Sequence, residues 1–192
     1  MERFRAYRVH QGGKFGEGRA GTMSRDEFDT GDVVVRTAYA SVNYKDALTA
    51  RGKAKIALRF PLVAGIDLAG TVESSGDTRF KPGDEVIVHS FGLGADHDGG
   101  YAEYGRFPAD WVIPLPQGLS LWESMALGVA GHTAALAIDL MDLNGLAPAR
   151  GKVLVNGATG GVASIAIDIL ASEAASFVTG QVIVADGGVS IL

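Results

Sequence analysis

The chain has 192 residues, of which 47% are hydrophobic and 20% are charged, a balance that is ordinary for a soluble globular protein. Its formal net charge is −5 and it contains no basic run, which argues against nucleic acid as a partner. Cysteine is absent, which excludes disulfides, thiolate zinc sites and cysteine nucleophiles and fits a cytoplasmic location. We expect no transmembrane helix and no signal peptide, because apolar stretches are short and the N-terminus MERFRAYRVH is charged.

The first 115 residues predict a strand-rich domain. β-Branched and aromatic residues gather in short segments, and turn residues such as Lys81-Pro82-Gly83-Asp84 separate them. Short strands at close spacing are typical of a barrel or a sandwich. One short helix, Asn43–Arg51, interrupts the series. The predicted strands are Phe4–Val9, Val33–Ala40, Leu68–Ser74, Glu85–His89 and Tyr101–Phe107.

From Ser120 the hydrophobic period becomes helical. The segment up to Gly145 predicts two helices with a break near Gly128–Gly131. Ser120 and Glu123 have the spacing of a capping box, which marks the start of the first helix. Asn144-Gly145 is a plausible stop for the second.

The tail predicts one β–α–β unit. Lys152–Asn156 is a short apolar strand, and residues 161–177 carry an apolar stripe at helical spacing. A second apolar strand, Gln181–Ala185, follows the Thr179-Gly180 turn. Such a unit is expected to be parallel and right-handed.

A glycine-rich turn joins the predicted strand to the predicted helix of this tail. Its pattern, Gly157-x-x-Gly160-Gly161-x-Ala163, could aim backbone N–H groups and a helix N-terminus at a phosphate. The alternative is a tight turn that merely requires glycine. A complete dinucleotide-binding domain would take roughly 130 residues after this point, so we expect an incomplete one. The candidate cofactor-binding residues are Asn156, Gly157, Thr159, Gly160, Gly161 and Ala163.

Six segments in order carry a family resemblance. They are SVNYKDAL (41–48), FPLVAGIDLAGTV (60–72), FKPGDEVIV (80–88), HDGGYAEY (97–104), ESMALGVAGHTAALAI (123–138) and VLVNGATGGVASIAI (153–167). Residues 3–170 resemble the zinc-free medium-chain dehydrogenase/reductases, in the quinone-oxidoreductase and acryloyl-CoA-reductase branch. The resemblance implies a mixed α/β chain that reduces activated C=C bonds or quinones with NADPH and holds no metal. It implies a GroES-like β-barrel domain over residues 1–119. It also implies linking helices and a truncated Rossmann-like β–α–β unit over residues 120–192.

The last stretch resembles a different family. LASEAASFVTGQVIVADGGVSI (170–191) is similar to the C-terminal end of short-chain dehydrogenase/reductases. The chain is therefore predicted to be a fusion joined near Ile169–Ser172. It contains no Tyr-x-x-x-Lys catalytic motif in this stretch.

The first resemblance implies a catalytic patch at the start of the short helix. Asn43, Tyr44 and Asp46 match the residues at the nicotinamide edge of the family's active site. Tyr44 could donate a hydrogen bond or a proton to the reduced substrate, and Asn43 could orient it. The alternative is a helix cap, with Asp46 solvated and Tyr44 packed on the barrel.

The histidines offer a second set of candidate catalytic residues. His97 lies between Asp96 and Asp98, which could form a metal site or an acid/base pair, although such a polar loop is more often solvated. His132 lies among Ala and Leu and is either a satisfied helix histidine or a new site residue. We expect no metal.

Two classes of function stay open. The first is an NADPH-dependent oxidoreductase whose cofactor domain is too incomplete for tight binding or for hydride transfer. The second is a folded chimera that is either an enzyme with a different activity, such as a hydrolase in the exposed cleft, or a non-catalytic binding module. Ser90, Ser124 and Ser164 are available as nucleophiles, but no G-x-S-x-G motif is present.

The tail also predicts self-association. Two parallel strands are marginal by themselves and leave unpaired edges. Pairing of Gln181–Ala185 with its mate across a two-fold axis would bury Val182, Ile183 and Val184. We therefore expect a homodimer or larger assembly, with a small-molecule substrate if the chain is active, and no membrane partner.

Overall fold

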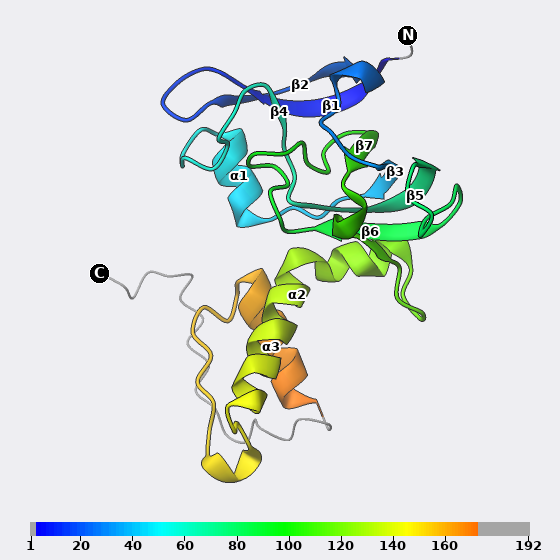
Figure 1. Cartoon of the computed structure of the whole chain (residues 1–192). Helices are drawn as coiled ribbons and strands as arrows, with labels where there is room; N and C mark the ends of the chain where they lie inside the picture. The colour runs from blue at the N-terminus through cyan, green and yellow to red at the C-terminus, as the bar shows by residue number, and fades with distance from the viewer. Residues whose placement is uncertain (1–2, 173–192) are drawn as a thin grey trace. The chain divides into compact units, whose positions relative to one another are not determined.

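The computed structural model describes residues 3–172, which divide into two compact units (Figure 1). The first unit comprises residues 1–129 and the second residues 130–192. The predicted boundary lies between residues 119 and 120, and the division after Val129 falls within the helix α2 (Leu121–Leu143).

A three-stranded antiparallel sheet in the order β2-β1-β4 forms one part of the first unit. β1 (Arg3–His10) pairs along its full length with β2 (Glu17–Ser24) and at one end with β4 (Leu62–Val63). Phe4, Ala6 and Val9 of β1 are buried, in keeping with the predicted strand.

A five-stranded antiparallel sheet in the order β7-β3-β5-β6-β8 forms the other part. β-Branched residues supply most of its buried face, which explains why the sequence pattern located its central strands. The strands are β3 (Val33–Tyr39), β5 (Asp67–Ser75), β6 (Glu85–His89), β7 (Tyr104–Phe107) and β8 (Val112–Pro114). The core side chains include Val33, Val35, Leu68, Val72, Val86, Val88 and Phe107.

The predicted strand Tyr101–Phe107 is divided between the two sheets. The Tyr7 N–H donates to the Tyr101 carbonyl at 2.7 Å, and the Glu103 N–H donates to the Arg5 carbonyl at 3.0 Å. The remaining residues form β7 and pair with β3. This segment therefore passes from one sheet to the other and links them, as a barrel-like domain requires.

β2 is a strand that the sequence pattern did not predict. Its residues, EGRAGTMS, include two glycines and no apolar alternation. It is an edge strand with a largely exposed face, and its pairing with β1 alone defines it. A strand of this kind is set by its partner and not by its own composition.

Helices complete the first unit. α1 (Tyr44–Ala50) lies within the predicted helix, and short 3₁₀ turns cover Arg25–Glu27 and Ala109–Trp111. α2 (Leu121–Leu143) has a non-helical residue at Gly128, with φ 52° and ψ −157°. The predicted break near Gly128–Gly131 is therefore confirmed.

The second unit is helical in the part that the structure describes. It contains α2 from Ala130 onward, a 3₁₀ turn at Pro148–Arg150 and α3 (Gly161–Ala171). Ala134, Ile138 and Leu170 are its buried apolar residues.

Two predictions for the tail were wrong within the described residues. Residues 152–156 form no strand, because a strand needs a ladder partner and none of residues 3–172 supplies one. α3 ends at Ala171 instead of residue 177, since Ser172 is extended, with φ −63° and ψ 153°. The predicted strand Gln181–Ala185 and the stretch like short-chain enzymes beyond Ser172 lie outside the described residues.

By length and composition α2 is a helix that could cross a membrane, contrary to the expectation from sequence. Its break at Gly128 leaves residues 129–143 as the longer continuous piece, about 22 Å at 1.5 Å per residue. The hydrocarbon core of a membrane is about 30 Å thick, so this piece is too short to span it.

Candidate functional site

The start of α1 gathers three of the residues predicted from the sequence. Asn43 is the N-cap of the helix, and its N–H donates to Asp46 Oδ2 at 2.8 Å. This is one arm of a capping box, which satisfies a backbone donor that the helix itself leaves free. Asn43, Tyr44 and Asp46 are therefore together because one local motif fixes the start of the helix.

Burial separates the roles of these three residues. The Tyr44 residue is 80% exposed, whereas Asp46 is 3% exposed. The Asn43 side chain is turned inward, since its Nδ2 donates to Ser41 Oγ at 2.8 Å. Tyr44 is thus the member that can reach a ligand in solvent, and Asn43 and Asp46 hold it in place.

Asp67 is the centre of this network, and the sequence analysis did not select it. It is fully buried at the start of β5 and accepts from the Ser41 N–H at 2.9 Å and the Val129 N–H at 3.0 Å. The Ser41 hydroxyl also donates to it. The available signal was a lone carboxylate inside the apolar run LVAGIDLAG, because buried charges are rare unless they are paired.

Position 128, where α2 contacts this network, has room and a backbone conformation for glycine alone. A Cβ built there would lie 2.9 Å from Asp67 Oδ2 and 2.8 Å from Ser41 Oγ. Its φ of 52° belongs to the left-handed region, which side chains disfavour. The break in α2 therefore turns the Val129 N–H toward the buried carboxylate.

Tyr101 closes the network from the segment that links the two sheets. Its hydroxyl donates to the Ser41 carbonyl at 2.8 Å. Burial and the nearby carboxylate of Asp46 raise the pKa of the Tyr101 phenol, so it stays a neutral donor. Loop 41–43, β5, α2 and residue 101 are thus joined at one place.

The burial of Asp46 predicts a pH-dependent stability. Burial is the largest cause that raises the pKa of this carboxyl above its ordinary value of 3.8. Because the pKa of Asp46 is higher in the folded state, the contribution of this carboxyl to the free energy of unfolding is fully present below pH 3.8. That contribution is lost as pH rises through the folded pKa. We expect Asp46→Asn to gain stability relative to the unaltered chain over that window, with a plateau above it.

Urea unfolding of both proteins from pH 3.5 to pH 8, roughly the span that brackets ordinary and raised carboxyl pKa values, measures this difference. A difference that is constant over the range would contradict the expectation. Asp110→Asn, at an exposed carboxyl, is the matched control.

A histidine and a serine meet at the end of β6. His89 Nδ1 lies 2.9 Å from Ser90 Oγ, and His89 is the register partner of Asp67 in the β5–β6 pair. Partners in an antiparallel pair project from the same face of the sheet. Ser90 and Phe91 both have positive φ, 66° and 46°, so the chain turns sharply here.

His97 has a structural environment. It is buried, with Nδ1 2.9 Å from the Asp98 carbonyl and Nε2 3.2 Å from the Thr30 carbonyl. Its ring meets Trp111 edge to face at 5.0 Å. The partners of His97 are thus Thr30, Asp98 and Trp111 and not the residues at the start of α1, so the structure does not bring the two sets of predicted catalytic residues together.

The carboxylates around His97 also form structural contacts, namely a backbone hydrogen bond and an ion pair. Asp98 Oδ1 accepts from the Val63 N–H at 2.7 Å, and Arg59 pairs with Asp29. Burial is the main cause that raises the pKa of Asp98. Over residues 3–172 no group of three or more His, Asp or Glu side chains is arranged to hold a metal ion.

His132 belongs to the second unit. It is exposed on α2, beyond the break at Gly128.

The glycine-rich turn retains features that suit a phosphate. Gly157 has φ 71°, and the Gly160 N–H donates to its carbonyl at 2.8 Å. Gly160 is the N-cap of α3, and with Gly161 it leaves the helix N-terminus without side chains. Thr159, Gly160 and Gly161 are exposed. These residues fit the pyrophosphate of a dinucleotide at a helix N-terminus.

The Asn156 side chain is occupied within the turn, since its Oδ1 accepts from the Gly157 N–H at 2.8 Å. Ala163 lies in the first turn of α3 and is half-buried.

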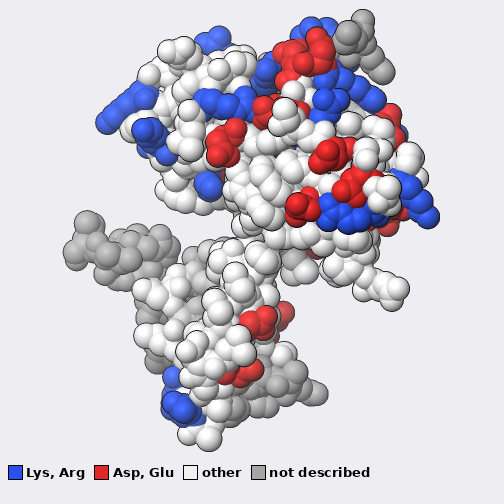
Figure 2. Space-filling model, in the orientation of Figure 1, with Lys and Arg blue, Asp and Glu red and all other residues white. Residues whose placement is uncertain are grey.

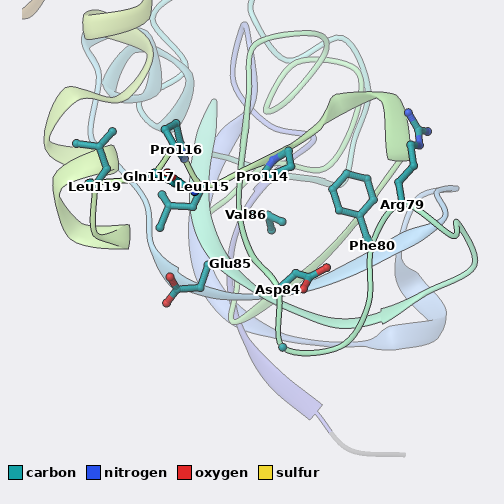
Figure 3. Close-up of a pocket in the computed structure, with 12 residues that line it drawn as sticks. Arg79, Phe80, Asp84, Glu85, Val86, Pro114, Leu115, Pro116, Gln117 and Leu119 are labelled. Carbon is teal, nitrogen blue, oxygen red and sulfur yellow. The ribbon is translucent and has the colours of Figure 1, made fainter.

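A separate cavity of about 540 Å³ lies beside β6 and β8 (Figure 3). Figure 3 shows the Asp84 and Glu85 carboxylates together with Phe80 and Leu115 along its wall. It shares no lining residue with the network at Asp67. Arg79 also lines it, so its wall carries charges of both signs.

Comparisons with known proteins show which proteins the chain resembles. Residues 29–117 match the model of the alcohol dehydrogenase GroES-like domain. YhfP, a candidate quinone oxidoreductase of Bacillus subtilis, is 50% identical over 149 residues, which are 78% of this chain and 45% of that protein. The acrylyl-CoA reductase AcuI of Ruegeria pomeroyi is 46% identical over the same shares of the two chains.

Solved structures agree. The Bacillus subtilis yhfP structure with NAD bound has a TM-score of 0.84 and 45% identity, and the match covers 88% of this chain and 52% of that chain. The Salmonella enterica yhdH oxidoreductase in complex with NADP has a TM-score of 0.83 and 41% identity, over 86% of this chain and 51% of that one. The chain spans about half the length of the relatives that it matches. Through its GroES-like domain and the partial Rossmann-like region that follows it, the chain is similar to these oxidoreductases.

Proposed function

We propose that this chain carries the substrate side of a nicotinamide-dependent reductase of activated C=C bonds or quinones. The observation that carries the proposal is the exposed Tyr44, held at the start of α1 by Asn43 and Asp46 and braced by the buried Asp67 network. Similar proteins support this proposal, because one of them is an acrylyl-CoA reductase and two similar solved structures contain NADP or NAD.

NADPH, when bound, supplies the hydride for such a reduction. The chain's own residues would bind the cofactor and orient the substrate. N–H groups at the start of α3 would hold the pyrophosphate beside Gly157 and Gly160. The Tyr44 hydroxyl would donate a hydrogen bond or a proton where negative charge develops on the substrate. Asn43 is a positioning residue, because its amide is bonded to Ser41 and fixes the backbone next to Tyr44.

We propose that this 192-residue chain binds NADPH weakly. The glycine-rich turn contacts only the phosphates, whereas ribose and nicotinamide are held by later parts of a two-half fold. Two expectations stay predictions. One is the fusion to a tail like that of short-chain dehydrogenase/reductases, and the other is the assembly of two or more copies through that tail.

The test is an assay of NADPH binding and oxidation by the full chain, with an enoyl-CoA or a quinone as acceptor. We expect a dissociation constant well above the micromolar range, and turnover only at high NADPH. Tyr44→Phe should lower that turnover by about 10²-fold, the usual size of one acid–base contribution, without a change in urea unfolding.

Tyr39→Phe is the matched control, because Tyr39 is also exposed and lies just before the same loop. Equal turnover of Tyr44→Phe and the unaltered chain would remove Tyr44 from the site. Complete absence of NADPH binding would favour a non-catalytic binding module.

A hydrolase has less support. Ser124 Oγ donates to the Leu121 carbonyl and Ser164 Oγ to the Gly161 carbonyl, so both hydroxyls serve their own helices. His97 faces two carbonyl oxygens. Neither Ser124 nor Ser164 is paired with a histidine, which a serine nucleophile requires. Ser90 Oγ lies 2.9 Å from His89 Nδ1, but that contact joins neighbours in the chain at a sharp turn, and no G-x-S-x-G motif surrounds the serine.

A further inference from the structure

Another cavity, of about 700 Å³, lies where the two sheets of the first unit are linked. Its lining residues come from β1, β2, the end of β3 and the linking residues 101–103. Its volume falls within the range of about 300–1,000 Å³ that small-molecule sites occupy. Asn43, Tyr44 and Asp46 do not line it, so this cavity lies outside the proposed substrate site.

Two rows of side chains cross the strands at this cavity. Arg5 is the register partner of Thr22, and the Glu103 N–H donates to the Arg5 carbonyl at 3.0 Å. The Thr37 N–H donates in turn to the Glu103 carbonyl at 2.9 Å. Opposite residues of antiparallel strands project from the same face, so these four residues form the first row. The second row lies two residues along each strand on the same face and comprises Ala20, Tyr7 and Tyr101.

The first row carries no net charge. Figure 2 shows that basic and acidic side chains adjoin at several places on the first unit, and Arg5 and Glu103 form one such pair. Glu103 Oε1 accepts from Arg5 Nη2 at 2.8 Å and from Nε at 3.1 Å, and Oε2 accepts from the Arg5 N–H at 2.7 Å. A charged ligand would have to compete with this ion pair, whereas a neutral ligand leaves it intact.

Thr37 has a hydroxyl that the fold does not use. Its Oγ1 is buried and has no hydrogen-bond partner among residues 3–172. Buried polar atoms are nearly always paired, and an unpaired one destabilises the protein that contains it. Thr22 in the same row differs, because its Oγ1 accepts from Arg3 Nε at 3.0 Å. A ligand with a hydroxyl would satisfy Thr37 Oγ1 as a donor or as an acceptor.

The second row is aromatic and apolar. The Tyr7 and Tyr101 rings are half-buried and pack against one apolar cluster that contains Val9 and Leu62. Ala20, opposite Tyr7, is exposed and leaves the neighbouring space free of a large side chain. Aromatic rings attract other flat rings in offset-stacked or edge-to-face arrangements.

We propose that this cavity binds a neutral two-ring aromatic alcohol. The rings pack beside Tyr7 and Tyr101, and the hydroxyl bonds to Thr37 Oγ1 next to the pair of Arg5 and Glu103. The volume, the neutral first row and the unpaired hydroxyl each select one property of this molecule. The binding requires neither NADPH nor a reduction.

Titration of the full chain with 2-naphthol, followed by the fluorescence of the naphthol, tests the cavity in the absence of NADPH. We expect saturable binding at one site per chain. Ala20→Leu should weaken binding by about tenfold or more, because the larger side chain occupies the space opposite Tyr7. Ser74→Leu, at an exposed position of β5 outside the cavity, is the matched control and should bind as the unaltered chain does.

Thr37→Val tests the hydroxyl, because valine keeps the shape of threonine and lacks its polar atom. Without ligand this variant should unfold at a higher urea concentration than the unaltered chain, since an unpaired buried group is removed. It should bind 2-naphthol about fivefold more weakly, the loss of one hydrogen bond. Naphthalene, which has no hydroxyl, should bind Thr37→Val and the unaltered chain equally.

Charge is tested with naphthalene-2-sulfonate, an anion of similar size, which should bind more weakly than 2-naphthol. Absence of saturable 2-naphthol binding to the unaltered chain would overturn the proposal. Equal affinities of the unaltered chain and a folded Ala20→Leu protein would do the same, as would undiminished binding to Thr37→Val or tighter binding of the sulfonate. Urea unfolding of each variant establishes that it is folded.

Discussion

Replacing Asp67 with alanine should destabilise the first unit by about 3 kcal/mol. The carboxylate is fully buried and accepts from the N–H groups of Ser41 and Val129 at 2.9 and 3.0 Å. Alanine would leave both amides without an acceptor, and each buried unsatisfied donor costs about 1–3 kcal/mol. Relief from burying a charge offsets part of this cost.

Asp67→Asn should be less damaging, because one oxygen remains as an acceptor while the new NH₂ group faces a donor. Urea unfolding followed by tryptophan fluorescence measures the change, since Trp111 and Trp122 both lie in the first unit. Asp110→Ala, which removes an exposed pair with Arg79, should change stability by less than about 1 kcal/mol. Equal stabilities for Asp67→Ala and Asp110→Ala would show that the network does not hold the unit together.

Gly128→Ala should cost about 2–4 kcal/mol through the backbone. The new Cβ would stand 2.8 Å from Ser41 Oγ and 2.9 Å from Asp67 Oδ2, closer than real Cβ contacts. The φ of 52° with ψ of −157° adds strain of about 1–3 kcal/mol for any residue with a side chain. Relaxation toward a continuous helix would withdraw the Val129 N–H from Asp67.

Gly21→Ala is the control for this change, because a Cβ at Gly21 meets nothing within 4 Å and its φ is not in the left-handed region. It should shift the urea midpoint little. A Gly128→Ala protein as stable as Gly21→Ala would mean that α2 has room to straighten without loss.

Local patterns determined much of the candidate site. Asn43, Tyr44 and Asp46 were predicted together from the resemblance of SVNYKDAL to the family's active site, and the capping box within four residues explains why the structure keeps them together. The break in α2 was predicted because glycine is the residue that tolerates its backbone conformation. The central strands of the larger sheet were predicted because their buried faces are rich in β-branched side chains.

The tertiary structure decided which of these residues face a ligand. Nothing in the sequence distinguished the exposed Tyr44 from the buried Asp46, since burial depends on what packs over α1. Asp67 was overlooked because its donors come from residues 41 and 129, far from it in the chain. β2 was overlooked because its pairing with β1 alone makes it a strand.

The sequence by itself thus indicated the fold class, the strands with strong patterns and the motifs whose partners lie within one helical turn. The structure alone revealed the Asp67 network, the division of residues 101–107 between two sheets and the close approach of Gly52 to the Gly16 carbonyl. The physical reason is the range of the interactions. Propensities and caps act between neighbours, whereas register and close backbone approach are fixed only when distant segments pack.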